Sequence, residues 1–175
     1  MALAAAFLLA GCGTPTSGKS LLPNSPRNIG LESTDFKNHD PMPAKCSADG
    51  GNVSPELHWG SPPPAGTKSF VIVLEDPDAP GTKPFVHWLL YSIPGNVEKL
   101  AEGQTPQGAV LGRNDAGMNA YFGPKPPSGT HHYVFRIYAL STTLDLPAGA
   151  TEPQLIRAME SRVLGMGELI GTFSH

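Results

Sequence analysis

The chain has 175 residues, enough for one domain with a substantial hydrophobic core. Its 12 Lys and Arg nearly balance 15 Asp and Glu, and this net charge of −3 argues against a nucleic-acid partner, which needs a strongly basic surface. The 20 Gly and 19 Pro residues exclude a helical bundle and favour short strands joined by turns. Two cysteines, Cys12 and Cys46, exclude a disulfide scaffold and a four-cysteine zinc site, and we expect no cofactor.

The first eleven residues, MALAAAFLLAG, form an apolar segment typical of an export signal. The tetrapeptide Leu9–Cys12 resembles a bacterial lipobox, in which Cys12 is lipidated and becomes the mature N-terminus. We therefore predict that residues 1–11 are a lipoprotein-type signal peptide and that the lipid holds the protein at the periplasmic face of a bacterial membrane. An ordinary secretory signal or a buried strand is the alternative. Residues 12–30 are small, polar and rich in proline, which predicts a flexible tether.

The domain is expected to span residues 31–175. Short strands are predicted at Leu31–Phe36 and within Ser54–Trp59. Three apolar runs rich in β-branched and aromatic residues predict buried strands, and these are Ser69–Leu74, His87–Ile93 and Tyr133–Leu140.

A helix is predicted over Thr151–Ile170. Thr151 and Gln154 match a capping box, and Pro153 lies in the first turn, where its missing N–H does no harm. Apolar residues recur at helical spacing along this range and would face the sheet. Gly165 and Gly167 are expected to thin or break the helix midway.

Polar residues gather where the predicted strands begin and end. Asp76 and Asp78 follow the first buried strand, while His87 and His131 open the next two. If the strands are antiparallel neighbours, these side chains meet at one end of the sheet. Each segment taken alone is compatible with a plain turn or a stiff connector, but their convergence predicts a binding site. The adjacent His131 and His132 should point to opposite faces of their strand and so cannot both bind one metal.

Three motifs in this order resemble the phosphatidylethanolamine-binding protein family, and its bacterial Raf-kinase-inhibitor-like branch in particular: Asp76–Pro80, His87-Trp88 and Gly123–Tyr133. The resemblance extends to Ser54–Trp59, Pro64–Phe70 and the ending Leu169–Phe173. It implies a mainly β fold, in which a large antiparallel sheet packs on a smaller one, with a C-terminal α-helix. It also implies a small cavity for phosphate, acetate or a phospholipid head group.

The resemblance assigns nine residues to that cavity: Asp76, Asp78, Pro80, His87, Tyr121, Gly123, Pro126, Pro127 and His131. Phe173 would correspond to the family's C-terminal aromatic residue near the pocket. We expect an aspartate beside His87 to raise the pKa of that ring, so that it offers a charged donor to an anion.

The resulting functional prediction is a non-catalytic protein that binds a small anion or phospholipid head group at the membrane to which it is tethered. An inhibitor of a protease or kinase is the alternative, because the family includes such inhibitors. A metal-dependent hydrolase with His87, His131 and Asp76 as ligands is a remote third. A homodimer is compatible with all three.

Overall fold

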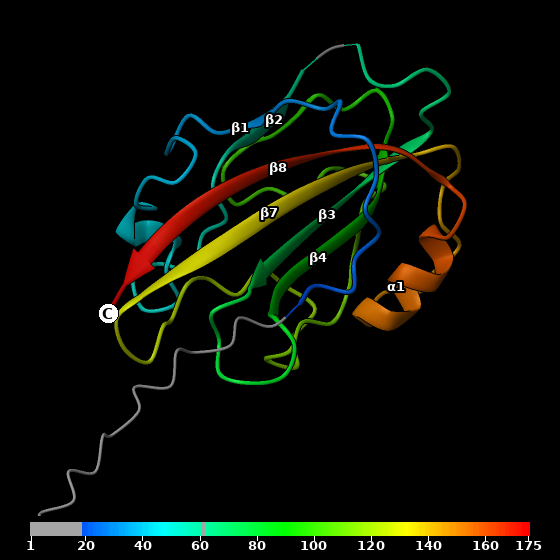
Figure 1. The fold of residues 1–175 in the computed structure, drawn as a ribbon. Helices are drawn as coiled ribbons and strands as arrows, with labels where there is room; N and C mark the ends of the chain where they lie inside the picture. The colour runs from blue at the N-terminus through cyan, green and yellow to red at the C-terminus, as the bar shows by residue number, and fades with distance from the viewer. Residues whose placement is uncertain (1–18, 61) are drawn as a thin grey trace, which may run out of the picture.

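A computed structural model describes residues 19–60 and 62–175 of the chain, so Cys12 and the predicted signal segment lie outside the described residues. The fold is mainly β (Figure 1). In chain order the elements are β1 (Leu31–Glu32), a 3-10 turn (Ala44–Cys46), β2 (Leu57–Trp59), β3 (Ser69–Asp76), β4 (Phe85–Pro94), β5 (Lys99–Leu100), β6 (Val110–Leu111), β7 (Thr130–Leu140), α1 (Glu152–Met159) and β8 (Val163–Ser174). Among the described residues, no helix has the length and apolar character needed to cross a bilayer.

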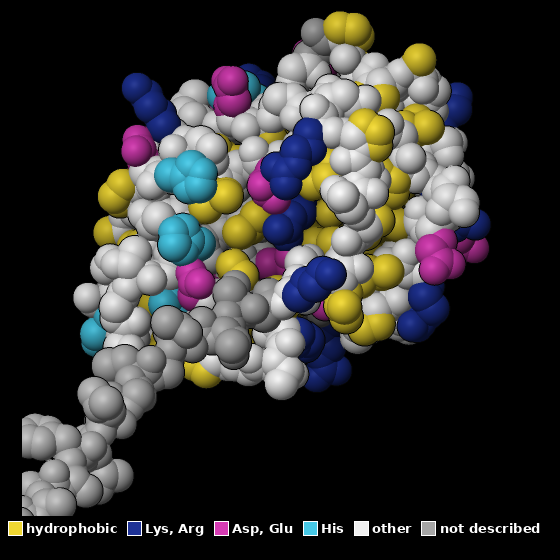
Figure 2. Space-filling view, viewed as in Figure 1, with side chains coloured by type: hydrophobic (Ala, Val, Ile, Leu, Met, Phe, Trp, Pro, Cys, Tyr) yellow, Lys and Arg dark blue, Asp and Glu magenta, His cyan; other side chains and the backbone are white. Residues whose placement is uncertain are grey.

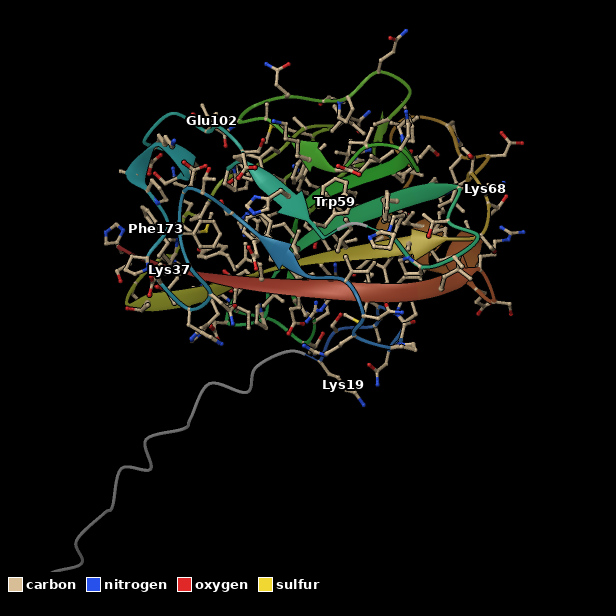
Figure 3. The ribbon with its side chains drawn as sticks, turned by 90° about the horizontal axis from the view of Figure 1, so that it is seen from above. Lys19, Lys37, Trp59, Lys68, Glu102 and Phe173 are labelled. Carbon is tan, nitrogen blue, oxygen red and sulfur yellow. The ribbon has the colours of Figure 1, made fainter. Side chains whose placement is uncertain are left out.

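The strands form two antiparallel sheets. The large sheet has the order β6-β4-β3-β7-β8, and the small sheet has the order β1-β2-β5. All three predicted buried strands lie together in the large sheet as β3, β4 and β7, with β3 between the other two. Figure 3 shows the small sheet stacked on one face of the large sheet, with Trp59 reaching into the space between them.

Alternation along β3 divides the core between the two faces of the large sheet. Phe70, Ile72 and Leu74 pack under the small sheet, whereas Val71 and Val73 pack on the opposite face. The whole of β3 is buried, as its continuous apolar run predicts.

The second face of the large sheet is covered by α1 and by the first described residues of the chain (Figure 1). Residues 12–30 are predicted to be a tether, but the chain already contacts the sheet from Ser20, whose hydroxyl donates to Glu75 Oε1 at 3.0 Å. Farther along, Arg27 donates to Glu168 Oε1 at 2.7 Å. Figure 2 shows this face, where basic side chains lie beside acidic ones within an apolar surround.

The prediction of a helix over Thr151–Ile170 is wrong in its second half. The helix starts where the capping box predicts, with the Thr151 N–H donating to Gln154 Oε1 at 2.8 Å, but it ends at Met159. After Ser161, which has a left-handed φ of 59°, the chain enters β8 and pairs with β7 along its whole length. The helix implied by the resemblance is therefore present in the C-terminal part of the chain as α1, and the chain ends in strand β8.

Two glycines favour a strand over a helix in the second half of the predicted helical range, where β8 begins. Glycine is a poor helix former, and a Cβ at Gly165 would overlap the side chain of Asn28. At Gly167 a Cβ would overlap the carbonyl of Ile29. The N-terminal segment therefore packs closely on β8 only because these positions carry no side chain.

Candidate functional site

The polar segments converge at one end of the large sheet, as predicted. β3 ends at Asp76, which pairs with Phe85 at the start of β4. On the other side of β3, Glu75 pairs with Val134 near the start of β7. Antiparallel pairing on both sides of β3 thus brings the end of one strand next to the beginnings of two others.

A β-bulge directs His87 into the site. Leu74 pairs with Trp88 and Glu75 with Val86, so His87 is an extra residue on β4 without a partner on β3. Such a bulge changes the direction of a side chain relative to regular alternation. The His87 ring packs edge-on against Tyr133, with 5.2 Å between ring centroids, and stacks on Phe122 at 5.6 Å.

A buried hydrogen bond joins Asp76 to His131. The Nδ1 atom of His131 lies 2.7 Å from Asp76 Oδ2, and the two residues are only 8% and 3% exposed. The other oxygen of Asp76 accepts the backbone N–H of Asp78 at 2.9 Å. Both oxygens of the Asp76 carboxylate are therefore held in place, and the ring of His131 is oriented by its bond to one of them.

The prediction that a neighbouring aspartate raises the pKa of His87 is wrong. Burial lowers the pKa of this ring below its ordinary value and outweighs the opposing effects of the Phe122 carbonyl and the Asp76 charge. The Nδ1 atom lies 2.8 Å from the Phe122 carbonyl, which can only accept, so Nδ1 carries the proton. In this neutral ring Nε2 is an acceptor.

These residues line a cavity of about 190 Å³. The residues that line it are Asp76, Ala79, Pro80, Phe85, His87, Phe122, Lys125, Pro127 and His131. Five of the nine predicted site residues are among them. Sequence reasoning missed four lining residues. Ala79 and Lys125 lie inside the quoted motifs, Phe122 directly precedes the third motif, and Phe85 lies two residues before His87, so a wider reading of the motifs would have found them.

Asp78 belongs to a different pair on the other side of β7. Its carboxylate accepts the backbone N–H of His132 at 2.8 Å and lies 2.6 Å from Nδ1 of the same residue. Burial raises the pKa of this carboxyl, but the bonds to His132 lower it by more. The net pKa therefore lies below its ordinary value. His131 is buried and His132 is exposed, as strand alternation predicts.

Tyr121 and Gly123 do not line the cavity and instead support the loop that borders it. The Tyr121 hydroxyl donates to the carbonyl of Cys46 at 3.0 Å, and its ring packs in the core. The N–H of Gly123 donates to Asn52 Oδ1 at 2.7 Å, and a Cβ here would overlap the backbone of Cys46.

Pro126 and Phe173 line a neighbouring cavity of about 300 Å³. Lys125 borders both cavities, and its Nζ lies 2.8 Å from Asp49 Oδ1 in an exposed ion pair. The positive charge of Lys125 is therefore at the rim of the site.

Tyr133 places a buried hydroxyl under this site. Burial raises its pKa, as does the charge of Asp76, so the hydroxyl keeps its proton. In residues 19–60 and 62–175, no group of three His, Cys, Asp or Glu side chains could hold a metal ion.

Comparison with known proteins decides the family. A family model described as phosphatidylethanolamine-binding protein matches residues 32–174. The chain belongs to this family. Among its PEBP relatives, the UPF0098 protein of Methanothermobacter thermautotrophicus is 41% identical over 83% of this chain and 98% of its own length. LppC of Mycobacterium tuberculosis, named as a candidate lipoprotein, is 42% identical over 79% of this chain and 68% of its own length.

Two solved PEBP structures have the same fold. A candidate PEBP homolog, CT736 of Chlamydia trachomatis, superposes with a TM-score of 0.80 at 36% identity and covers 84% of this chain and 97% of its own. Escherichia coli YbcL, described as a member of the mammalian PEBP family, gives a TM-score of 0.79 at 29% identity over 84% of this chain and 98% of its own.

Proposed function

We propose that this PEBP-family protein binds the singly protonated form of a phosphate monoester, such as the free phospholipid head group phosphoethanolamine, and does not convert it. The observation that carries the proposal is the buried Asp76–His131 hydrogen bond, 2.7 Å long, on the wall of a small cavity that also contains the neutral His87. These groups bind and orient an anion through hydrogen bonds, one donated by the ring of His131 and one accepted by the ring of His87.

Asp76 prepares the site for an anion by holding the ring of His131 through Nδ1, which leaves Nε2 of that ring for a ligand. Once this ring is an imidazolium, Nδ1–H donates to Asp76 and Nε2–H can donate to a phosphate oxygen. The P–O–H group of a singly protonated phosphate donates in turn to Nε2 of His87. Lys125 adds positive charge at the rim.

The expected affinity is modest. No arginine is among the residues that line the cavity in the described part of the chain, so a bidentate guanidinium contact to the phosphate is lacking there. The volume of about 190 Å³ suits a head group and not an acyl chain. A lipid with a phosphomonoester head would therefore bind with its chains outside.

Calorimetry with phosphoethanolamine tests the coupling to protons. Because the second pKa of a phosphate monoester is about 6, we expect binding to weaken about tenfold or more between pH 6 and pH 8. Repeating the titration in buffers of different ionisation enthalpy should show proton uptake at pH 8. Equal affinity across this range contradicts the proposed protonation.

The adjacent histidines provide a matched pair of variants. His131→Ala should abolish measurable binding, whereas His132→Ala, on the opposite face of the same strand, should leave affinity unchanged. Phosphorus NMR of the ligand after prolonged incubation should show it intact. Release of inorganic phosphate would contradict a non-catalytic role.

The same proposal places the protein at a bacterial membrane through a lipid on Cys12. Support comes from the lipobox-like tetrapeptide and from the name of the relative LppC. In phase partition with a non-ionic detergent, the full chain should enter the detergent phase and Cys12→Ser should remain in the aqueous phase. Inhibition of a protease or kinase stays a prediction.

A further inference from the structure

One edge of the large sheet is covered by the N-terminal part of the chain in two separate places. At the first, the N–H of Met166 donates to the carbonyl of Pro26 at 2.9 Å, and the Met166 carbonyl accepts from the N–H of Ile29 at 3.1 Å. At the second, residues 38–42 cover β8 near Thr172. Both bridges run parallel to β8, so this edge already pairs with extended backbone in that direction.

Between the two covered places, the edge of β8 is open at Glu168. Backbone groups along a strand point alternately to its two neighbours. Met166 and Ile170 direct their backbone N–H and carbonyl groups outward to the covering segments. Glu168 lies midway between them, so its backbone groups also point outward. Neither its N–H nor its carbonyl has an outward hydrogen-bond partner among the residues described. Residues 30–37 connect the two covering segments, but they leave the edge of β8 instead of pairing with Glu168. Leu31–Glu32 within them form β1 in the small sheet.

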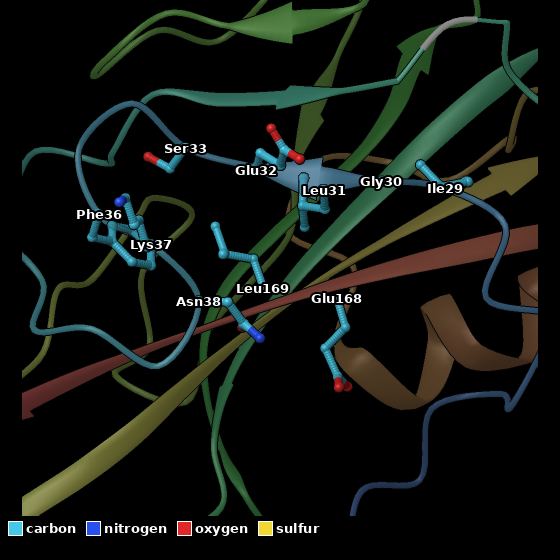
Figure 4. A pocket seen from close by; sticks show the side chains of 10 residues that line it. All are labelled: Ile29, Gly30, Leu31, Glu32, Ser33, Phe36, Lys37, Asn38, Glu168 and Leu169. Atoms are coloured by element: carbon cyan, nitrogen blue, oxygen red, sulfur yellow. The ribbon is translucent and has the colours of Figure 1, made fainter.

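A cavity of about 470 Å³ occupies this opening (Figure 4). Leu31 and Leu169 extend into the space between β1 and β8, and Phe36 borders it. The side chain of Glu168 points away from this space in Figure 4, toward Arg27 and its other ion-pair partner Arg136. What Glu168 presents to the cavity is therefore its peptide backbone.

Asn38 adds a further donor next to the gap. Its Oδ1 accepts the N–H of Ile170 at 2.9 Å, which leaves the Nδ2 hydrogens available. The opening thus offers the N–H and carbonyl of Glu168, spaced as in a β-ladder, with a side-chain amide beside them and an apolar wall. This combination matches the peptide group and an attached apolar side chain.

We propose that this gap binds a short extended peptide, which completes the interrupted parallel cover of β8 at Glu168. As at Thr172, where the Asp40 carbonyl accepts and the Met42 N–H donates, the pairing groups come from two residues on either side of a central one. The carbonyl of the preceding residue accepts from the Glu168 N–H, and the N–H of the following residue donates to the Glu168 carbonyl. The central residue shares the face of the Glu168 side chain, so it is the side chain of a flanking residue that packs against Leu31, Phe36 and Leu169. Addition of a strand at a sheet edge is a common mode of peptide recognition, and here the two flanking bridges restrict it to a short segment.

Proton–nitrogen NMR of the full chain tests the proposal with N-acetyl-valyl-valine methylamide as the probe. Saturable shifts are expected for the Glu168 amide and the Asn38 side-chain amide. A depsipeptide in which the pairing N–H is replaced by an ester oxygen should bind about tenfold more weakly, because one hydrogen bond is lost. Equal binding of the two probes would overturn backbone pairing.

Two glycines allow matched variants. A Cβ at Gly30, which lines the cavity, meets no atom within 4 Å, and the same holds for Gly60, which does not line it. Gly30→Leu should therefore fill the opening and weaken probe binding at least tenfold, by the loss of apolar contacts. Gly60→Leu should bind the probe as the parent does, and thermal unfolding of both variants checks the fold.

A subtler variant changes the donor alone. Asn38→Asp keeps the oxygen that accepts from Ile170 but replaces the amide donor with a carboxylate. Probe affinity should fall about fivefold or more for loss of this hydrogen bond. Absence of any Glu168 shift at millimolar probe, or shifts that persist unchanged in Gly30→Leu, would show that the gap does not bind peptide.

Discussion

Asp76–His131 and Asp78–His132 are built from the same turn and from adjacent residues of β7, with ring-to-carboxylate distances of 2.7 Å and 2.6 Å. Their surroundings differ. The side chains of the first pair are 4% and 10% exposed, and those of the second are 31% and 50% exposed. Strand alternation places one pair at the cavity and the other on the opposite face of β7. Identical chemistry can therefore support ligand binding in one place and only a surface contact in the other.

The stability of paired variants is the strongest test of this comparison. Asp76→Asn should lower the free energy of unfolding by about 3 kcal/mol, because it weakens a buried pair and leaves a buried ring with a poorer partner. Asp78→Asn should cost less than about 1 kcal/mol, as is usual for exposed pairs. Urea unfolding of both variants at pH 7 measures the difference. Similar losses would mean that burial does not separate the two pairs.

Another buried carboxyl sharpens the comparison because its neighbour is a second acid. Glu152, at the start of α1, has a pKa raised to about 7, first by burial and then by Glu75, while Lys83 Nζ is 4.0 Å away. Asp115 adds a further negative charge nearby. The folded state therefore holds a proton that the unfolded chain releases above its ordinary pKa of 4.5. Stability contributed by this proton is present at low pH and is lost as pH rises toward and through 7.

Glu152→Gln should consequently stabilise the protein by about 2 kcal/mol at pH 8 and change little at pH 5. Denaturant unfolding at the two pH values measures this effect. Glu160→Gln, at an exposed position directly after the helix, serves as the control and should be neutral at both. A gain of the same size at pH 5 would contradict the proton bound by Glu152 in the folded state as the cause.

Local sequence patterns predicted much of this site, because the positions of Asp76, His131 and His132 depend only on strand length and alternation. The apolar run of β3 and the Asp-Pro-Asp turn place Asp76 at a sheet end, and alternation separates His131 from His132. The neutral state of His87 was not predictable from the sequence. It depends on a bulge set by the pairing of β4 with β3 and on a carbonyl supplied by Phe122.

The C-terminal segment shows a second limit. The spacing of apolar residues from Leu155 to Ile170 fits a helix. The signal against a helix in this range is the pair of glycines at 165 and 167. Their importance comes from the N-terminal segment that packs on them, which is more than 130 residues distant in sequence. A contact of that kind cannot be read from local periodicity.

The smallest expected effect concerns the exposed pair and its dependence on pH. Because bonds to His132 hold the pKa of the Asp78 carboxyl below its ordinary value of 3.8, the stability from this pair is present above that value and lost as pH falls through the lower folded pKa. The difference between the parent and Asp78→Asn should therefore shrink from less than about 1 kcal/mol at pH 6 toward zero at pH 2. Concentrated salt should reduce the difference at pH 6, since exposed charges are screened. A difference at pH 6 that resists salt would place this pair, like Asp76–His131, out of contact with solvent.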